Sequence, residues 1–338
     1  MRLNRRIISG VLILIFAFIT STGCGGEKIT LRFASDAPDD HIVTSLNEEA
    51  AQKIEERTNG RVKVNYYGGS KLGIYESVYV ELVRGTIDIA QITVPDTRDP
   101  GLAAPYLPYY ATSWDEAAVL YDPDSYMSRM FAEIIARTDV RFLGWVLEGF
   151  IGTGVAIEPD NVFEPGKPKG IRLRTPESPI FRIPQEDLGY SGVTVSYADV
   201  PAVIRTKIVD GWIGGTPNVN YRWIGDGITK MYVNYLHAEA TSYVMSEKSL
   251  AKLSESDRAI VIEVFEEQSR KSFKYAQANE EEYMQRLSDS GVEVIEFMPE
   301  VIQANADFIR NVTWTKLEDV LTKELIDNFR AEVEKLRH

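Results

Sequence analysis

The sequence predicts an α/β protein of two lobes, each a mostly parallel sheet flanked by helices, with one long helix that crosses both lobes. Strand-like and helix-like segments alternate from residue 31 to residue 94, which is typical of a parallel sheet with helices on its faces. A second alternation of this kind runs from residue 171 to residue 213. The helical pattern at 254–289 is much longer than a usual helix and suggests a brace across both lobes.

The N-terminus has the layout of a secretory signal peptide, which we place at residues 1–23. Three arginines among the first six residues precede an apolar run at 11–19 and small residues at 20–23. The apolar run is shorter than the roughly 20 residues that a membrane-spanning helix needs. We therefore expect an exported protein that works in the periplasm or another extracytoplasmic space.

Cys24 is the only cysteine of the chain, so no internal disulfide can form. Together with Ser21, Thr22 and Gly23 it resembles the bacterial lipobox, whose cysteine carries a lipid, although that motif usually has Leu in place of Ser21. The alternative is an ordinary signal peptidase site, since Ser21 and Gly23 are both small. We expect lipidation at Cys24 and no other contact with the membrane.

The acidic composition excludes a nucleic-acid-binding protein. The formal net charge is −13, and removal of residues 1–23 with their three arginines would change it to −16. Such a surface repels polyanions but says little about a small ligand, which responds to the local field of its cleft. With 338 residues, of which 44% are hydrophobic, the chain can bury two modest cores.

The first lobe is predicted to begin with two consecutive β-α-β units. A helix at 42–58 has an amphipathic pattern and closes at Asn59 and Gly60, and a helix at 75–84 ends at Gly85. Further elements of this lobe are expected as strands at 31–34, 61–67, 86–94 and 140–146, and as a helix at 114–137 interrupted at Pro123. A Pro- and Tyr-rich stretch separates the third strand from that helix.

The second lobe is predicted to start near residue 150. Its elements are expected as extended segments at 151–157, 171–175, 207–213 and 292–297, and as helices at 199–206, 300–310 and 314–336. Residues 82–88 resemble residues 204–210, which fits either two lobes of similar construction or the general chemistry of helix-to-strand turns. The predicted boundaries are 29–149 with 237–270 for lobe I, and 150–236 with 291–338 for lobe II.

No catalytic residue, metal site or cofactor site can be identified. The histidines are His41, His237 and His338, and none has the spacing of a metal ligand. The chain has no G-x-S-x-G motif, no P-loop and no dinucleotide-binding glycine motif after a strand. His237 is best explained as a structural residue at a crossover between the lobes. We therefore predict that the protein is not an enzyme and uses no metal or cofactor.

Arg174 is the first candidate for ligand binding. The alternation in 171–175 places Arg172 and Arg174 on the opposite face from Ile171 and Leu173, and Arg174 lies near the carboxyl end of the strand. Ligands bind beyond the carboxyl ends of strands in open α/β sheets, and a guanidinium group can hold a carboxylate with two parallel hydrogen bonds. The alternative is an ion pair on the surface.

Two segments resemble the signature of the DctP-type solute-binding proteins of tripartite ATP-independent periplasmic (TRAP) transporters. They are Gly170-Ile-Arg-Leu-Arg-Thr-Pro176 and the stretch from Asp199-Val to Ile208-Val-Asp-Gly211, whose order and spacing agree with the family pattern. Asp199, Pro201, Val203 and Lys207 depart from it. Residues 70–73, 84–90 and the position of His237 are also similar, so the resemblance covers essentially the whole mature chain.

The resemblance implies a two-lobed periplasmic binding protein that closes on a small organic acid and delivers it to a TRAP membrane permease. Arg174 matches the arginine with which the family pairs the ligand carboxylate. Tyr197 lies close to the position of an aromatic residue that contacts the ligand in this family, although a core aromatic at a helix start is the alternative. Gly214, Asp36 and Thr93 are further expected ligand contacts.

Departures from the family pattern narrow the expected ligand. Many members have a second arginine where this chain has Ile151, and a Glu-Asn pair where it has Ile213 and Gly214. Aromatic residues are available instead, although they could equally belong to the core. They are Trp212, Phe150, Trp145 and Tyr197. We therefore expect a monocarboxylate with an apolar or aromatic body.

Two other functions are compatible with the same fold. A receptor of an ABC transporter or of a sensor kinase would share the cleft and differ in its partner. A periplasmic enzyme would need a nucleophile, a base and an orienting residue, and the sequence presents no such set.

Overall fold

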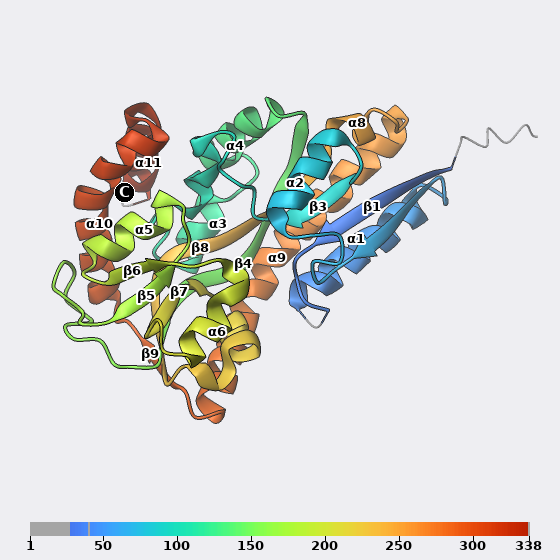
Figure 1. Cartoon of the computed structure of the whole chain (residues 1–338). Helices are drawn as coiled ribbons and strands as arrows, with labels where there is room; N and C mark the ends of the chain where they lie inside the picture. Colours follow the sequence, from blue (N-terminus) through green and yellow to red (C-terminus); the bar gives the residue numbers. More distant parts are fainter. Residues whose placement is uncertain (1–27, 40, 337–338) are drawn as a thin grey trace, which may run out of the picture.

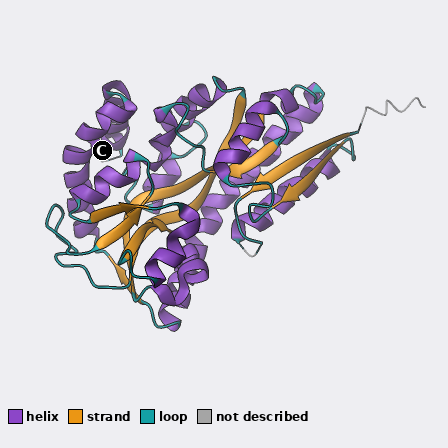
Figure 2. Ribbon diagram, in the orientation of Figure 1, coloured by secondary structure: helices purple, strands orange, loops and turns teal. Residues whose placement is uncertain are grey.

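The computed structural model describes residues 28–39 and 41–336, and the predicted signal peptide and Cys24 lie outside these residues. Helices surround the strands along the whole molecule (Figure 2). The α/β class predicted from the sequence is therefore confirmed.

The first elements are the two consecutive β-α-β units that the sequence predicts. They are β1 (Ile29–Ser35), α1 (Ile42–Arg57), β2 (Val62–Tyr67), α2 (Tyr75–Arg84) and β3 (Ile89–Ile92). Strand β1 pairs in parallel with β2 on one side and with β3 on the other. At the start of α1, the His41 side chain accepts a hydrogen bond from the Val43 amide, and α2 ends at Gly85 in the left-handed conformation with φ 79°.

The chain then passes through short helices into the first of two long strands. These elements are η1 (Pro100–Tyr106), α3 (Trp114–Leu120), α4 (Tyr126–Ala136) and β4 (Val140–Val155), and the second long strand is β8 (Lys230–Ser246). Strands β4 and β8 are antiparallel, and β8 also pairs antiparallel with β3. Their register shifts three times, between Phe142 and Gly144, between Leu147 and Phe150, and between Ile151 and Thr153.

These register shifts explain a difference from the prediction. The sequence predicts two separate strands in place of β4 and no element at residues 230–246. Each bulge moves the side chains that follow to the other face, so the period-two pattern is lost along both strands. Gly144 and Gly149 occupy two of the irregular positions with φ 147° and 128°, which L-residues rarely adopt.

The second half again contains parallel strands. Its elements before β8 are β5 (Arg172–Thr175), α5 (Pro179–Asp187), β6 (Ser191–Thr194), η2 (Tyr197–Asp199), α6 (Val200–Arg205), β7 (Gly211–Gly215), α7 (Pro217–Val219), η3 (Asn220–Ile224) and η4 (Gly225–Gly227). Strand β5 is parallel to β6 and to β7, while β7 pairs antiparallel with β4. Strand β7 starts later than predicted, because Lys207 has φ 59° and the chain still turns there.

The remaining elements close the chain. They are α8 (Glu247–Leu250), α9 (Glu255–Asp289), β9 (Glu293–Glu296), α10 (Pro299–Leu321) and α11 (Lys323–Lys335). The expected break between residues 310 and 314 is wrong, because α10 continues through them and buries Trp314 in the core. The break comes at Thr322, whose φ of 76° ends one helix and whose hydroxyl accepts the Leu325 amide of the next.

Helix α9 confirms the predicted brace across both halves (Figure 1). Its N-terminus is capped by Ser254, whose side chain accepts the Asp257 amide. In its first half Glu267 forms a forked pair with Arg57 of α1, at 2.8 Å for each hydrogen bond. In its second half Asn279 accepts a hydrogen bond from Asn218 of α7 at 3.4 Å. One helix thus contacts elements of both halves.

Together the strands form a nine-stranded sheet in the order β2-β1-β3-β8-β4-β7-β5-β6, with β9 paired to β8. The largest cluster of buried hydrophobic residues takes members from both predicted lobes, while two smaller clusters lie within one half each. The lobe boundaries predicted from the sequence remain a proposal. Within residues 28–39 and 41–336, none of the helices combines the length and the apolar character that crossing a membrane requires.

Candidate ligand-binding site

Arg174 lies on β5 with only 4% of its surface exposed. Its Nε donates a hydrogen bond to the Val195 carbonyl oxygen at 2.9 Å. Burial lowers its pKa to about 10, and the neighbouring phenols of Tyr197 and Tyr75, whose own pKa values are raised by burial, are uncharged near neutral pH. Arg172, two residues earlier, is exposed and forms the ion pair with Asp210 at 3.0 Å. The two arginines of this strand therefore differ sharply in environment.

A cluster of three aromatic residues, Tyr197, Trp212 and Trp223, contacts Arg174 through Tyr197. The Tyr197 ring lies 5.9 Å from Arg174 Cζ and stacks on Trp223 at 4.4 Å between ring centroids. Tyr197 is 49% exposed, so one part of this aromatic stack is open to a ligand. Trp212 is fully buried beneath it, and its indole N–H donates to Asn220 Oδ1 at 2.9 Å.

Gly214 lies beside the Trp212 ring and the Arg174 guanidinium, and because it has no side chain it leaves space there. A Cβ atom at this position would lie 3.4 Å from Arg174 Nη1 and 3.1 Å from the ring of Trp212, and the φ of 148° favours glycine. The structure therefore brings together four residues predicted from the sequence, namely Arg174, Tyr197, Trp212 and Gly214.

Asp36 and Thr93 lie at equivalent places in the first half, directly after β1 and β3. Asp36 accepts a hydrogen bond from Ser70 Oγ at 3.0 Å. Because β1 and β3 are parallel, their carboxyl ends meet at one edge, as do those of β5 and β7, which carry Arg174 and Gly214. In each half this is the kind of edge, at the carboxyl ends of parallel strands, where open α/β sheets bind ligands.

Two carboxylates on the long strands were not predicted from the sequence. On β8, Glu239 Oε1 accepts a hydrogen bond from the Tyr106 hydroxyl at 2.9 Å, and that hydroxyl lies 2.8 Å from Thr93 Oγ1. On β4, Glu148 Oε1 accepts hydrogen bonds from Thr241 Oγ1 at 2.8 Å and from a glutamine side chain of β3 at 3.1 Å. The hydrogen-bond network thus joins the predicted Thr93 to the unpredicted Glu239.

The carboxylates and Arg174 act on one common group, the hydroxyl of Tyr197. Burial raises the pKa of Tyr197 well above its usual value, the charges of Glu239, Glu148 and Asp36 raise it further, and Arg174 lowers it. Acidic groups and a basic group therefore shift the pKa of Tyr197 in opposite directions.

Burial is also the main cause of the raised pKa values of Glu239 and Asp36. It raises the pKa of Glu239 to about 8, with a further increase from the charge of Glu148. It raises the pKa of Asp36 to about 6, against the opposing hydrogen bond from Ser70. Glu239 and Asp36 nevertheless retain partial exposure. Enclosure of the two carboxyl groups by protein disfavours their charged forms, which accounts for the raised pKa values.

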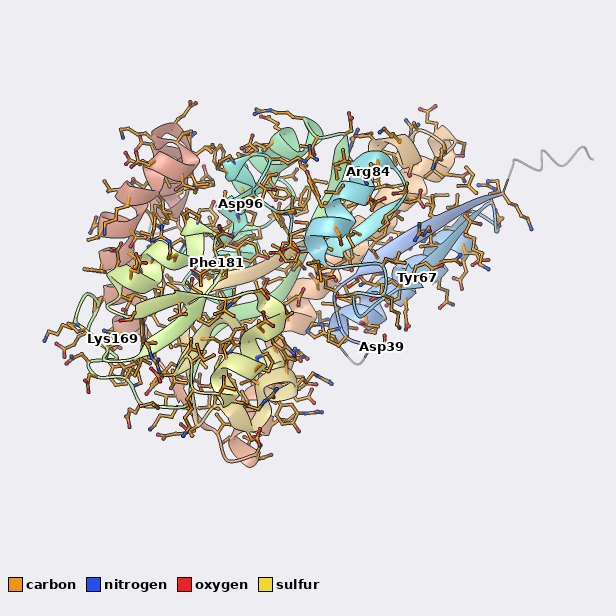
Figure 3. All side chains as sticks on the ribbon, in the orientation of Figure 1. Asp39, Tyr67, Arg84, Asp96, Lys169 and Phe181 are labelled. Atoms are coloured by element: carbon orange, nitrogen blue, oxygen red, sulfur yellow. The ribbon has the colours of Figure 1, made fainter. Side chains whose placement is uncertain are left out.

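His237 supports this region without facing a ligand. It is fully buried, its Nδ1 lies 2.6 Å from the Tyr106 carbonyl oxygen, and burial lowers its pKa to about 4. Its ring packs against Phe181 of α5, which Figure 3 labels, at 4.8 Å between ring centroids. Asp96 accepts a hydrogen bond from Ser178 at 2.6 Å, so the two halves are in direct contact here.

Phe150 and Trp145 lie in the hydrophobic core. Phe150 contacts Trp114 at 5.2 Å and Tyr235 at 4.4 Å between ring centroids, and Trp145 packs on Phe131 at 4.6 Å. The structure does not bring these two aromatic residues to Arg174, and a ligand contact for Phe150 stays a prediction. In residues 28–39 and 41–336, there is no group of three or more His, Cys, Asp or Glu side chains that could hold a metal ion.

Two curated relatives have similar sequences. A solute-binding protein of Chromohalobacter salexigens is 21% identical over 268 residues, which is 74% of this chain and 74% of that protein. The sialic acid-binding periplasmic protein SiaP of Vibrio cholerae is 23% identical over 234 residues, which is 69% of this chain and 72% of that protein.

Solved structures share the fold. A TRAP periplasmic solute-binding protein from Ochrobactrum anthropi matches with a TM-score of 0.81 and 18% identity over 92% of this chain and 96% of its own. DctP7, a Bordetella pertussis extracytoplasmic solute receptor binding pyroglutamic acid, matches with a TM-score of 0.75 and 18% identity over 89% of this chain and 99% of its own. These structures confirm the two-lobed fold.

The family is shown by the sequence itself. The model of the bacterial extracellular solute-binding proteins, family 7, matches residues 33–317, which include every site residue described above. The chain therefore belongs to this family, the DctP-type solute-binding proteins of TRAP transporters.

Proposed function

We propose that the protein is the extracytoplasmic receptor of a TRAP permease and that it binds a small organic acid through Arg174. The observation that carries the proposal is a guanidinium group, 4% exposed, that forms no ion pair with a carboxylate of residues 28–39 and 41–336. Burying an unpaired charge is costly, and a ligand carboxylate would supply the missing partner with two parallel hydrogen bonds. The ligand would bridge the two lobes and favour their closed arrangement.

The surroundings of Arg174 support a ligand with one carboxylate and an apolar or aromatic body. The half-exposed ring of Tyr197 offers a flat surface for such a body. Asp36, Glu148 and Glu239 all raise the pKa of the Tyr197 hydroxyl, so a second carboxylate near this ring would meet acidic groups. Repulsion from these groups disfavours dicarboxylates as ligands.

The first test is a thermal-shift screen of the protein against small organic acids, repeated with Arg174→Ala. A ligand at 100 times its Kd should stabilise the folded protein by about 2.7 kcal/mol, and this stabilisation should disappear in the variant. Arg172→Ala is the matched control, because Arg172 lies on the same strand and already pairs with Asp210. Hits that Arg174→Ala leaves unchanged would contradict the proposal.

Arg174→Lys tests the geometry of recognition. Lysine keeps the charge but cannot form the planar, two-fold contact with a carboxylate, so it should not restore the affinity of the wild type. Calorimetric titration of a hit from the screen measures this directly. An unchanged Kd in the Lys variant would show that the ligand needs only a positive charge at this position.

Export through the signal peptide 1–23 and lipid attachment at Cys24 complete the proposal. Both rest on the sequence alone. Expression with its leader in a bacterial host should place the wild type in the membrane fraction and Cys24→Ser in the soluble fraction. Intact mass measurement of the wild type should show an acylated N-terminus at Cys24, and an unmodified cysteine there would contradict lipidation.

A further inference from the structure

Trp223 packs against the half-exposed ring of Tyr197. The two rings stack with their centroids 4.4 Å apart and an angle of 30° between their planes. We propose that Trp223 is a positioning residue that holds the Tyr197 ring beside Arg174 and thereby makes the receptor prefer carboxylates with a planar, aromatic body. This inference rests on the proposed function of Arg174.

Two contacts join the segment of Tyr197 to Arg174. The guanidinium carbon Cζ lies 5.9 Å from the centre of the Tyr197 ring. Arg174 Nε also donates to the carbonyl oxygen of Val195, two residues before Tyr197, at 2.9 Å. The body of a ligand whose carboxylate binds to Arg174 would therefore lie close to this ring.

The backbone around Tyr197 does not by itself fix its ring. Tyr197 opens η2, a turn of only three residues, and 49% of its surface is exposed. Exposed side chains exchange rotamers rapidly, and fixing such a side chain when a ligand binds costs affinity. The stack with Trp223 and the tilted contact with Trp212, at 6.4 Å between ring centroids, restrict the ring before a ligand arrives.

The turn that carries Trp223 is fixed to the end of β7. Trp223 lies in η3, a single turn of π-helix, which is a conformation frequent at functional sites. The turn begins at Asn220, a fully buried residue whose Nδ2 donates to the carbonyl oxygens of Gly215 at 3.0 Å and of Thr216 at 3.1 Å. The position of Trp223 is therefore tied to the strand that pairs with β5.

Arg174, Tyr197, Trp212 and Trp223 form a closed circuit of contacts. Arg174 and Trp212 are register partners in the parallel pairing of β5 with β7. The rings of Trp212 and Trp223 meet edge to face at 5.8 Å between centroids. Tyr197 closes the circuit, because it contacts both Trp223 and Arg174. Loss of the Trp223 ring would release Tyr197, while Arg174 would keep its strand pairing and its hydrogen bond.

The test compares carboxylates of similar volume that differ in planarity. Suitable pairs are benzoate with cyclohexanecarboxylate, phenylacetate with cyclohexylacetate, and 2-furoate with tetrahydro-2-furoate. In calorimetric titrations of the wild type, the aromatic member of at least one pair should bind about fivefold more tightly than its partner. Trp223→Leu should reduce this ratio to less than about twofold and change the affinity for the saturated member by less than about twofold. A merely structural role would weaken both members equally.

Trp223→Phe and Tyr221→Leu are the matched variants. Phenylalanine keeps a planar ring for the stack, so Trp223→Phe should retain most of the preference. Tyr221 lies on the same turn and packs on Tyr283 of α9 at 5.6 Å, so Tyr221→Leu should leave the preference unchanged. Urea unfolding reports the stability of each variant separately, and Trp223→Met replaces the Leu variant should that variant unfold.

A double-mutant cycle tests whether Trp223 acts through Tyr197. Tyr197→Ala should remove the preference by itself, and the addition of Trp223→Leu should change it no further. A further loss in the double variant would show that Trp223 contacts the ligand directly, and would overturn its role as a positioning residue.

The outcomes separate this inference from the proposed function. Equal binding of aromatic and saturated members, with loss of both in Arg174→Ala, would overturn the role of Trp223 and leave the carboxylate receptor standing. A preference that survives Trp223→Leu, or that Tyr221→Leu removes to the same extent, would do the same. The absence of binding by all pairs would also overturn this inference, whereas the proposed function depends on the broader screen of organic acids and its comparison with Arg174→Ala.

Discussion

Glu280 allows a direct test of how burial of a carboxyl group makes the stability of this protein depend on pH. It lies on α9 with 2% of its surface exposed, and its Oε2 accepts a hydrogen bond from the Phe150 amide at 2.8 Å. Burial raises its pKa from 4.5 to about 7. Because the folded protein holds this proton more tightly than the unfolded chain does, its contribution to stability is complete below about pH 4.5 and is lost as the pH rises through about 7.

The change from 4.5 to about 7 corresponds to about 3 kcal/mol of unfolding free energy. Glu280→Gln keeps an oxygen acceptor for the Phe150 amide but cannot ionise. The unfolding free energy of the variant, minus that of the wild type, should therefore increase by about 3 kcal/mol between about pH 5 and about pH 8.5.

Urea unfolding across this pH range measures the difference. Glu239, which also has a raised pKa, is present in both proteins, so its effect cancels in the comparison. Glu281→Gln is the matched control, because Glu281 is the exposed neighbour on the same helix and should give a nearly constant difference. A constant difference for Glu280→Gln as well would refute the proposed ionisation of a buried carboxyl group.

Two further substitutions test the aromatic wall of the site. Gly214→Ala places a Cβ 3.1 Å from the Trp212 ring at a φ of 148°, so we expect it to cost at least about 1 kcal/mol of stability and to weaken ligand binding, as measured by unfolding and calorimetry. A fully stable variant with unchanged affinity would contradict the close packing at this position. Trp212→Phe removes the donor to Asn220 Oδ1 in a fully buried site, so it should lower the unfolding free energy by about 2 kcal/mol or more. A loss below about 0.5 kcal/mol would show that the indole hydrogen bond is replaceable.

Elements with strong local signals were predictable from the sequence. Helix α2 has an amphipathic pattern that stops at Gly85, and α9 starts at the Ser254 cap and keeps one pattern to Asp289. Strand β8 was missed, because its pairing with β4 contains bulges that destroy the alternation. Helix α10 runs past residue 310 because burial of Trp314 depends on tertiary packing, which local patterns do not show.

Arg174 could be predicted from the sequence, whereas the carboxylates Glu148 and Glu239 could not. Arg174 stands out because it is a cation at the end of an alternating strand and matches a family motif. Glu148 and Glu239 carry no such signal, since the chain has 50 Asp and Glu residues. Only the pairing of β4 with β8, which brings together residues about ninety positions apart in the sequence, places these two carboxylates in one part of the sheet.

The crossing of β4, β8 and α9 between the halves has a consequence for protein engineering. The chain passes from one half to the other three times within regular elements, so no single linker can be cut to release a lobe (Figure 1). A lobe transplanted from a relative would bring only fragments of these strands and would leave unpaired edges. New specificity is therefore better introduced by exchanging side chains at the strand ends, such as Asp36, Thr93 and Gly214, on an unchanged frame.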